Sequence, residues 1–327
     1  MAVNNSSLLS MLDWAKRTDP DGKFQFIVEM LAQDNAMLDD MPWQPCNQKT
    51  AHRTTLRTSL PTPVWRLVNQ YTQPTKSTTA QATFGTGILD AWSELDPDGV
   101  NGDLKKARLT EAMAHLESMA QEMQQTVIYG SAANPEEFLG FSPYYSNLTD
   151  NSAENIIDAG GTQSDNMSIW LVGWGDRSTY GIFPEGSTAG LERKDYGLSV
   201  SENTSGRMAV YREQFKWKAG LVVEDWRKTV RIANIDKSSL VADGAGTSVK
   251  LIEYMIDATH RQWKPTTVNS VFYVNRVTAK MLDIQAQNKT NVYLTVGMEE
   301  GKRKLSFRGI PIKTVDALVD NETRIVA

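Results

Sequence analysis

The chain has 327 residues, and its 34 Lys and Arg against 39 Asp and Glu give a formal net charge of −5. Such a length holds one large or two ordinary domains, and the acidic balance argues against a dedicated nucleic-acid binder, which is usually basic. Because Cys46 is the only cysteine, an intrachain disulfide and a zinc site built on several thiolates are both excluded.

The first forty residues predict a helical arm. Apolar residues recur at helical spacing over 6–17, the sequence TDPDG at 18–22 predicts a turn, and a second helix is expected over 24–38. These short amphipathic pieces indicate an arm over residues 1–40 rather than a self-contained domain.

Residues 41–89 contain no Asp or Glu, although they carry five cationic side chains. These are Lys49, Arg53, Arg57, Arg66 and Lys76. The many threonines favour extended strands, which Pro61, Pro63 and Pro74 divide into pieces. A two-stranded ribbon without an apolar face is only marginally stable in water. The stretch is therefore either a solvated surface loop or, as we hypothesise, an arm that lies on an acidic neighbour.

An acidic turn over 94–103 separates this stretch from the longest predicted helix. A calcium loop beginning at Asp96 is not supported, because Val100 occupies a ligand position and Asn101 replaces the central glycine. Asp103 instead suits the N-cap of a helix over 103–130 that ends at Gly130. Its apolar residues form one continuous stripe: Leu109, Ala112, Met113, Leu116, Met119, Ala120, Met123 and Val127.

A β-rich block follows this helix. Residues 131–166 are rich in Ser, Asn, Gly and Pro and predict loops, whereas 168–175 and 179–183 are apolar runs typical of buried strands. Residues 186–206 predict a glycine-bearing connection, and 208–236 return to a strand-like pattern. We expect 168–236 to form an antiparallel sheet that packs against the long helix.

The last ninety residues alternate helices and strands. Helices are predicted over 248–263 and 276–287, strands over 271–274, 292–296, 310–315 and 324–326, and a charged hairpin tip at 299–304. No apolar run is long enough to span a membrane, and no secretory leader is recognised. We therefore expect a protein of the reducing cytoplasm without a membrane partner.

Motifs that carry catalytic chemistry are nearly missing. The GTGILD sequence at 85–90 lacks the third glycine of a dinucleotide-binding turn, and neither a phosphate-binding loop nor a Gly-x-Ser-x-Gly elbow occurs. A glycosidase pair would have to be chosen from many carboxylates, for example Glu192, Asp195, Glu213 and Glu224. We predict no catalytic, cofactor-binding or metal-binding residues and no cofactor, hence a protein that is not an enzyme.

The order of these parts resembles the major capsid proteins of tailed bacteriophages, with the Hong Kong 97-type fold. The resemblance is carried by LPTPVWR at 60–66 with QPTKSTTAQA at 73–82, WKAGLVVEDWRKTVRIANID at 217–236, FYVNRVTAKMLDIQAQ at 272–287 and FRGIPIKTVDAL at 307–318. The first pair is similar to the extended loop of one branch of these coat proteins, and the 217–236 stretch to that branch's most recognisable segment. The last two are similar to the core of the axial domain.

The resemblance implies an α+β fold in four parts. These are an N-terminal helical arm (1–40), an extended β loop (41–89), a peripheral domain with its sheet and spine helix (90–237), and a compact α/β axial domain (238–327). In much of the family, later strands of the peripheral domain follow the axial domain. Here the similar block, 168–236, precedes it, which implies a rearranged connectivity.

The implied function is that of a major capsid protein, which self-assembles through hexamers and pentamers into the icosahedral head of a double-stranded DNA phage. Its place is the virion, after assembly in the host cytoplasm. In this family the extended loop reaches over a neighbouring subunit, so inter-subunit contacts are expected from Arg53, Arg57, Trp65, Arg66 and Lys76. Further expected partners are scaffold, portal and decoration proteins.

Charge agrees with this function. The cationic loop would suit an acidic patch on a neighbour, such as Glu94, Asp96 and Asp98. Coats that recruit a genome electrostatically need basic tails, and the sequence has none. We expect the shell to enclose double-stranded DNA without sequence-specific binding.

Other interpretations stay open. An encapsulin-like compartment shell would use the same fold. A β-rich carbohydrate- or receptor-binding module would use exposed tryptophans as a stacking platform, although tryptophans at strand spacing more often fill a core. The candidates are Trp170, Trp174, Trp217 and Trp226. A hydrolase would need a convergent acid or histidine site, and the sequence indicates none.

Overall fold

The structure is a computed structural model that describes residue 33 and residues 35–99, 104–187, 190–203, 206–242, 250–288, 294–299 and 302–326. The helix expected over 6–17 lies outside these residues, as do most of the helix expected over 24–38, the expected N-cap Asp103 and part of the hairpin tip at 299–304. Of the predicted arm, the structure describes a short helix, α2 (Ala36–Asp40).

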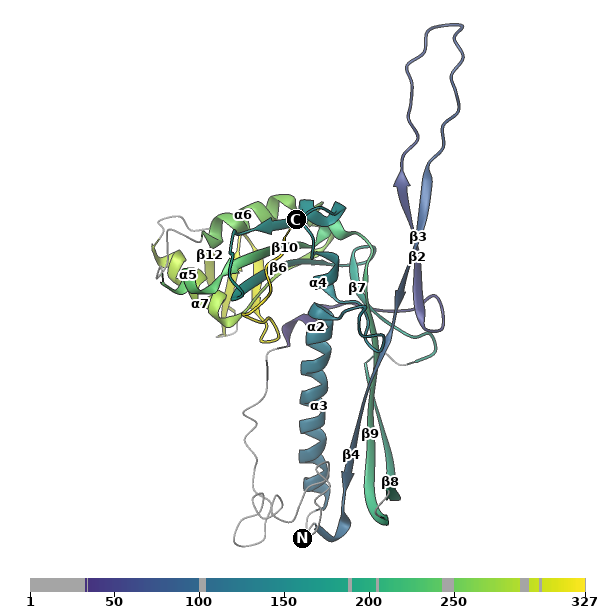
Figure 1. The fold of residues 1–327 in the computed structure, drawn as a ribbon, viewed down its shortest axis with the longest axis vertical. Coiled ribbons are helices and arrows are strands. Elements are labelled where there is room, and N and C mark those ends of the chain that lie inside the picture. Colours follow the sequence, from purple (N-terminus) through teal and green to yellow (C-terminus); the bar gives the residue numbers. More distant parts are fainter. Residues whose placement is uncertain are drawn as a thin grey trace.

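The molecule is elongated, with a ribbon at one end, a helix-backed sheet at the other and an α/β region to one side (Figure 1). The described helices are α2, α3 (Leu104–Tyr129), α4 (Phe141–Tyr144), α5 (Lys237–Ala242), α6 (Leu251–Arg261) and α7 (Arg276–Asn288). Short 3-10 turns are η1 (Pro97–Gly99), η2 (Asn151–Asn155), η3 (Trp226–Lys228) and η4 (Pro265–Thr267).

The described strands are distributed over the whole chain. They are β1 (Trp43–Pro45), β2 (Ala51–Ser59), β3 (Thr78–Gly85), β4 (Gly87–Leu95), β5 (Ile156–Asp158), β6 (Asn166–Trp174), β7 (Thr179–Phe183), β8 (Leu191–Asn203), β9 (Gly206–Val223), β10 (Val230–Asp236), β11 (Asn269–Val274), β12 (Leu294–Glu299), β13 (Lys302–Phe307) and β14 (Ile310–Thr314). β2 and β3 form a sheet of their own, and the others belong to one branched sheet.

The lower half of the molecule in Figure 1 is α3 lying along β4 and β9. β9 pairs antiparallel with β4 on one side and with β8 on the other. Met119 of α3 packs on Phe215 of β9 and Leu89 of β4. The helix lies where the sequence predicts it. Two residues of the predicted apolar stripe are not buried, however. Leu109 and Met113 face away from the sheet and are 58% and 59% exposed.

β8 corrects the prediction of a glycine-bearing connection over 186–206. The segment is a thirteen-residue strand paired with β9. Gly197 lies in it at a register shift after Asp195 and has φ +65°, a conformation that glycine adopts without strain. The glycines therefore mark a bulge and the strand ends, not a loop.

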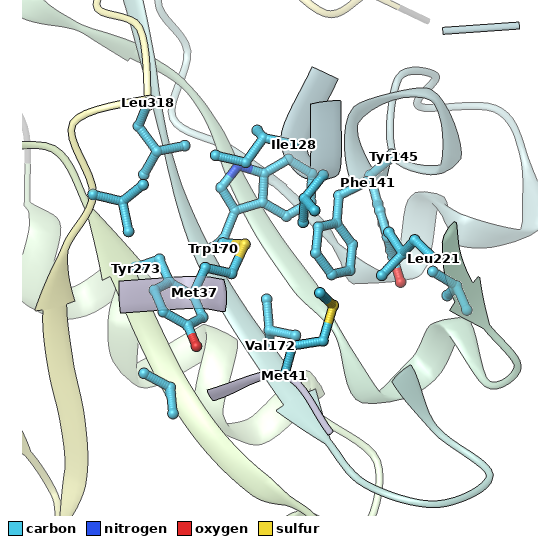
Figure 2. Close-up of a cluster of buried hydrophobic side chains, with 14 of the residues drawn as sticks. Met37, Met41, Ile128, Phe141, Tyr145, Trp170, Val172, Leu221, Tyr273 and Leu318 are labelled. Carbon is cyan, nitrogen blue, oxygen red and sulfur yellow. The ribbon is translucent and has the colours of Figure 1, made fainter. Parts of the chain in front are cut away.

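β6 is the centre of the α/β region, and all nine of its residues are buried. A strand buried on both faces needs a layer on each side. Alternate residues meet these layers: Ile169 and Leu171 pack in the cluster with α6 and α7, whereas Trp170 and Val172 pack with the end of α3 and with α4. Figure 2 shows the second layer, where Ile128, Phe141 and Met37 surround Trp170.

The pairing of β6 corrects the expected block over 168–236. β6 pairs antiparallel with β10 on one edge and with β11 on the other, and β11 pairs parallel with β14. β6 and β10 thus share a sheet with strands of the last ninety residues. Of the expected block, β8 and β9 form the sheet beside α3, and sequence-local patterns do not reveal this division because pairing is non-local.

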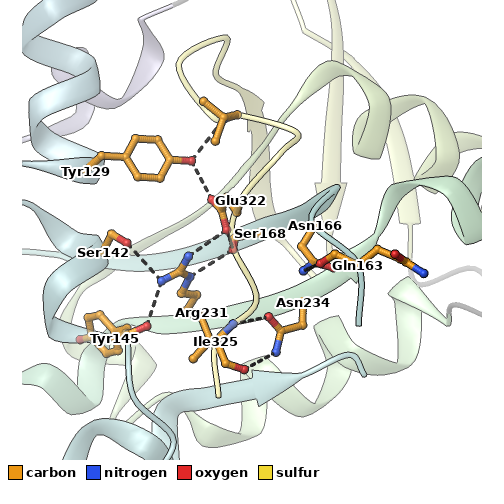
Figure 3. A network of polar contacts seen from close by, with 11 residues as sticks. Tyr129, Ser142, Tyr145, Gln163, Asn166, Ser168, Arg231, Asn234, Glu322 and Ile325 are labelled. Atoms are coloured by element: carbon orange, nitrogen blue, oxygen red, sulfur yellow. Dashed lines mark hydrogen bonds and ion pairs between the residues drawn. The ribbon is translucent and has the colours of Figure 1, made fainter. Parts of the chain in front are cut away.

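A buried ion pair ties the C-terminal segment to the end of α3 (Figure 3). Arg231 Nη2 of β10 lies 2.8 Å from Glu322 Oε2, and the two residues are 3% and 8% exposed. Glu322 also accepts hydrogen bonds from Tyr129 Oη at 2.7 Å and from Ser168. Burial, together with the adjacent Glu322 carboxylate, raises the pKa of Tyr129.

The strand predicted over 324–326 is wrong. Ile325 N donates to Asn234 Oδ1 at 2.8 Å, and Asn234 Nδ2 donates to Ile325 O at 2.9 Å (Figure 3). One side-chain amide therefore satisfies both main-chain groups that a partner strand would otherwise satisfy. Residues 324–326 therefore form no strand.

Candidate assembly interface

The ribbon β2–β3 projects beyond the rest of the molecule (Figure 1). Its antiparallel register pairs Ala51 with Gly85 at the root and Ser59 with Thr78 at the far end. β2 ends just before Pro61, since proline has no N–H to donate to a strand partner. The strands predicted within 41–89 are therefore present, and the prolines bound them.

The root of the ribbon is anchored in the body. Phe84 is buried with Tyr180, Ile182 and Val222. Thr86 donates from N and Oγ1 to Thr50 O at 3.3 and 3.0 Å. Beyond this root, most side chains of the ribbon are exposed, so the ribbon lacks an apolar face of its own, as its composition predicts.

The outer end of the ribbon, residues 60–77, is called the tip below. Its large apolar side chains are between 66% and 101% exposed: Leu60, Val64, Trp65, Leu67, Val68 and Tyr71. Contiguous exposed apolar groups of this kind mark interaction sites in soluble proteins. Burial of one aromatic side chain such as Trp65 removes roughly 150–250 Å² from water.

A turn over residues 67–70 shapes the tip. Gln70 N donates to Leu67 O at 3.2 Å, and Leu67 N donates to Gln70 Oε1 at the same distance. Asn69 has φ +67°, which asparagine tolerates at this position of a turn. Arg66 Nη1 donates to Gln70 O at 3.1 Å, so the guanidinium lies next to the turn. The tip thus presents its aromatic and cationic groups from a hydrogen-bonded loop.

The predicted contact residues are distributed along the ribbon. Arg53 and Arg57 lie on β2, whereas Trp65, Arg66 and Lys76 lie on the tip, and all five are exposed. None of the four cations forms an ion pair with a residue that the structure describes. Trp65 and Arg66 lie together at the far end of the ribbon, and Arg53 is closer to its root.

Of the acidic patch expected around Glu94, Asp96 and Asp98, Glu94 is already held by a cation of its own subunit. Arg212 Nη2 lies 2.5 Å from Glu94 Oε1, and Ser201 Oγ donates to Glu94 Oε2 at 3.1 Å. Asp96 Oδ1 accepts from Asp98 N at 2.9 Å within the turn. Glu94 is thus already paired inside its own sheet, a non-local contact that the sequence pattern did not show.

Arg108 of α3 joins the helix to the sheet. Its Nε donates to Glu213 Oε1 at 2.7 Å, and its Nη2 donates to Asp195 Oδ2 at 2.5 Å. The hydrogen bond from Arg108 lowers the pKa of Asp195. Arg193 Nη2 donates to Glu213 Oε2 at 2.8 Å. Two of the carboxylates considered for a glycosidase pair are therefore held by arginines as structural contacts.

The outer face of β4, β8 and β9 carries a second set of exposed groups that the sequence analysis missed. Trp92 stacks on Tyr196 with ring centroids 5.4 Å apart, and they are 44% and 42% exposed. Tyr196 Oη donates to Gln214 Oε1 at 3.0 Å, and Gln214 Nε2 donates to Asp90 Oδ2 at 2.8 Å. The available signal in the sequence was the period of two over this strand, in which Leu89, Ala91 and Leu95 alternate with Asp90, Trp92 and Glu94.

Trp170 and Trp174 are 0% and 1% exposed, so neither can stack on a ligand. Within the described parts of the chain, no three His, Cys, Asp or Glu side chains gather as a metal site. No described helix is long and apolar enough to cross a membrane.

Comparison with known proteins identifies a protein family and a similar chain in a solved phage structure. A family model described as major capsid protein GP7 matches residues 19–326. A chain in a near-atomic-resolution structure of bacteriophage Epsilon15 is 34% identical, with 100% of both chains covered and a TM-score of 0.81. No curated protein matches significantly.

Two further solved structures are far more distant. A chain of the bacteriophage JBD30 capsid is 10% identical over 90% of this chain and 96% of its own, with a TM-score of 0.49. A chain of the holo-SrpI encapsulin complex from Synechococcus elongatus is 8% identical over 70% and 96%, with a TM-score of 0.45. Likeness at this level carries no argument about function.

Proposed function

The chain belongs to the family described as major capsid protein GP7 and is a phage coat protein, and we propose that many copies of it build a closed shell. Copies of the chain associate as hexamers and pentamers and close into the icosahedral head of a tailed phage with double-stranded DNA. The expected α+β fold of the Hong Kong 97 type is confirmed by the likeness to the Epsilon15 chain.

One observation carries this proposal: the tip is apolar, cationic and exposed at the end of a ribbon with no core of its own. A chain that stayed monomeric would gain nothing from such a surface and would risk aggregation. A shell subunit covers it with a neighbour. We therefore propose that Arg53, Arg57, Trp65, Arg66 and Lys76 contact another subunit.

We keep the four-part division as a proposal and change one boundary. The arm is 1–40 and the extended loop is 41–89. The peripheral part is built on α3, β4, β8 and β9, whereas β6 and β10 join α5–α7 and β11–β14 in the axial part. The boundary expected at 237 is replaced by this division, and the rearranged connectivity relative to the family stays a prediction.

Scaffold, portal and decoration proteins are proposed partners, assembly takes place in the host cytoplasm, and the proposed role is structural rather than enzymatic. An encapsulin-like compartment would assemble in a similar way. Identity of 34% over the whole Epsilon15 chain favours the phage coat.

The test is particle formation by the recombinant chain, followed by size-exclusion chromatography and negative-stain microscopy. Wild type is expected to form closed shells or rings of hexamers and pentamers. Arg53→Glu with Arg57→Glu is expected to keep the fold and to reduce particles at least tenfold, because the charge that docks the ribbon is reversed.

Lys105→Glu with Arg324→Glu is the matched control, since it makes the same change in net charge at two exposed positions outside the ribbon. It is expected to assemble normally. Normal shells from the ribbon variant would contradict charge-dependent docking. A wild-type chain that stays monomeric even with a scaffold protein would contradict the proposed assembly.

A further inference from the structure

We propose that the tip docks into a pocket of a second copy of this chain, with Trp65 entering the pocket and Arg66 at its acidic rim. The pocket lies between α3, β4 and residues 134–138. This inference rests on the proposed function, because it names the partner surface that the ribbon contacts in the shell.

The pocket has the size and chemistry for an aromatic side chain with a cation beside it. Its volume is about 420 Å³, within the range of roughly 300–1,000 Å³ that ligand pockets have. Leu89, Met123 and Phe138 give it apolar walls, and Glu122, Glu136 and Glu137 add carboxylates.

The carboxylates are not neutralised within the subunit. Glu122 and Glu136 are exposed, and neither forms an ion pair with a residue in the described parts of the chain. Glu137 Oε1 accepts from Asn134 Nδ2 at 3.1 Å, which fixes the loop and leaves its charge uncompensated. The pocket thus adds three negative charges to an apolar opening.

The wall that carries Phe138 is held firmly against α3. A Cβ atom added at Gly140 would lie 2.5 Å from Thr126 O and 2.7 Å from Gly130 N. Gly140 N donates to Gly130 O at 2.9 Å. Such an approach is possible only for glycine, so the loop fits against the helix end and the pocket exists before any partner arrives.

The tip complements this pocket both in its apolar surface and in its charge. Trp65 is fully exposed and Arg66 follows it, and Trp and Arg are the residues most enriched at interface hot spots. No acid occurs over 41–89 to repel the carboxylates. The turn at 67–70 already orders the tip, which reduces the entropy lost on docking.

The occupant must come from another copy. Gly87 of the pocket adjoins the root of the ribbon, whereas Trp65 lies beyond its far end. The eight residues of β3 alone span about 26 Å at ~3.3 Å per residue. The ribbon extends away from α3 (Figure 1), so the tip of one chain could reach its own pocket only by breaking the β2–β3 ladder.

A charge swap tests the contact. Arg66→Glu and Glu136→Lys are each expected to reduce particle yield at least tenfold, and the two together in one chain are expected to restore at least half of it. The control variant combines Arg66→Glu with Glu185→Lys, which changes an exposed acid outside the pocket. This control should not recover particle yield. Absence of recovery in the Arg66→Glu, Glu136→Lys variant would overturn the docking.

Cross-linking identifies the two surfaces. After mild oxidation of shells, Trp65→Cys with Glu136→Cys should give a ladder of linked chains on a denaturing gel, whereas Trp65→Cys with Glu253→Cys should not. The buried native Cys46 contributes no ladder in wild-type shells. Shells without the ladder, or a link within one chain, would overturn the pocket and leave the proposed function standing. If the cysteine variant does not assemble, the charge swap decides alone.

Discussion

Arg231 and Glu322 lie almost entirely out of water, and removal of one of them leaves the other as a buried charge without its partner. Breaking such a pair typically costs about 3–5 kcal/mol, more than the pair contributes relative to apolar residues. Arg231 also donates to Tyr145 O at 2.9 Å and lies over the Trp170 ring, 4.8 Å from its centroid. The guanidinium is thus central to the packing in Figure 3.

We predict that Glu322→Ala lowers the free energy of unfolding by about 3–5 kcal/mol, because it leaves the buried Arg231 charge without its partner. Urea unfolding of the unassembled subunit, followed by tryptophan fluorescence, measures this. Asp320→Ala is the matched control, since Asp320 pairs with Lys237 where both side chains are partly exposed. It should cost at most about 1 kcal/mol. Equal effects of the two substitutions would contradict the buried-charge argument.

Single residues show where sequence-based prediction stops. Exposure of Trp65 follows from the missing apolar face of its stretch, which is a local property. Pairing of Arg231 with Glu322, and of Glu94 with Arg212, joins residues far apart in the chain. One sequence does not contain this information, and for that reason it does not predict that Glu94 is paired within its own sheet.

At the scale of elements, the end of α3 and the loop after it behave as one unit. Gly130 N donates to Thr126 O at 2.8 Å, and a Cβ atom at Gly130 would lie 2.5 Å from Thr126 O and closer still to Phe138 O. Both obstacles are backbone atoms, which cannot rotate away. The sequence predicts Gly130 as the helix end, but not that a second segment packs directly on it.

We predict that Gly130→Ala lowers the free energy of unfolding by about 1–3 kcal/mol, the usual cost of overpacking, and also lowers particle yield because the Phe138 wall of the pocket shifts. Gly85→Ala is the control, since nothing lies within 4 Å of its added Cβ. It should be neutral, or stabilising by at most about 1 kcal/mol through the unfolded chain. Thermal melts of both variants provide the measurement, and a neutral Gly130→Ala would refute the close approach.

The elements themselves divide into two groups by predictability. α3, β6 and β11 have strong local periodicity, and the sequence places them within a few residues. β8 was missed because its glycines look like a loop, and the membership of β6 and β10 in one sheet with β11 depends on pairing across the chain. The type and position of an element follow from its local sequence, whereas its pairing partners depend on residues far away in the chain.

At the scale of the whole molecule, the ribbon and the pocket make the subunit incomplete. One chain presents an apolar, cationic tip far from its body and a negatively charged, partly apolar pocket beside its long helix. Each surface is complementary to the other and both occur on every copy. Such a heterologous contact continues from chain to chain, and it generates a ring where the rotation closes.

The net charge of −5 leads to the last prediction, which concerns DNA. Non-specific binding to duplex DNA depends on lysines and arginines that neutralise phosphates and release counterions. A subunit with a net charge of −5 repels phosphates at long range, and in the shell its cationic tip is docked on a neighbour. We predict that assembled shells and subunits give no mobility shift of duplex DNA near physiological salt, about 0.15 M. Arg53→Glu with Arg57→Glu serves as the comparison. If wild type bound DNA with a steep salt dependence and this variant did not, the ribbon would be a DNA-binding arm, and its cations would not be reserved for a neighbouring subunit.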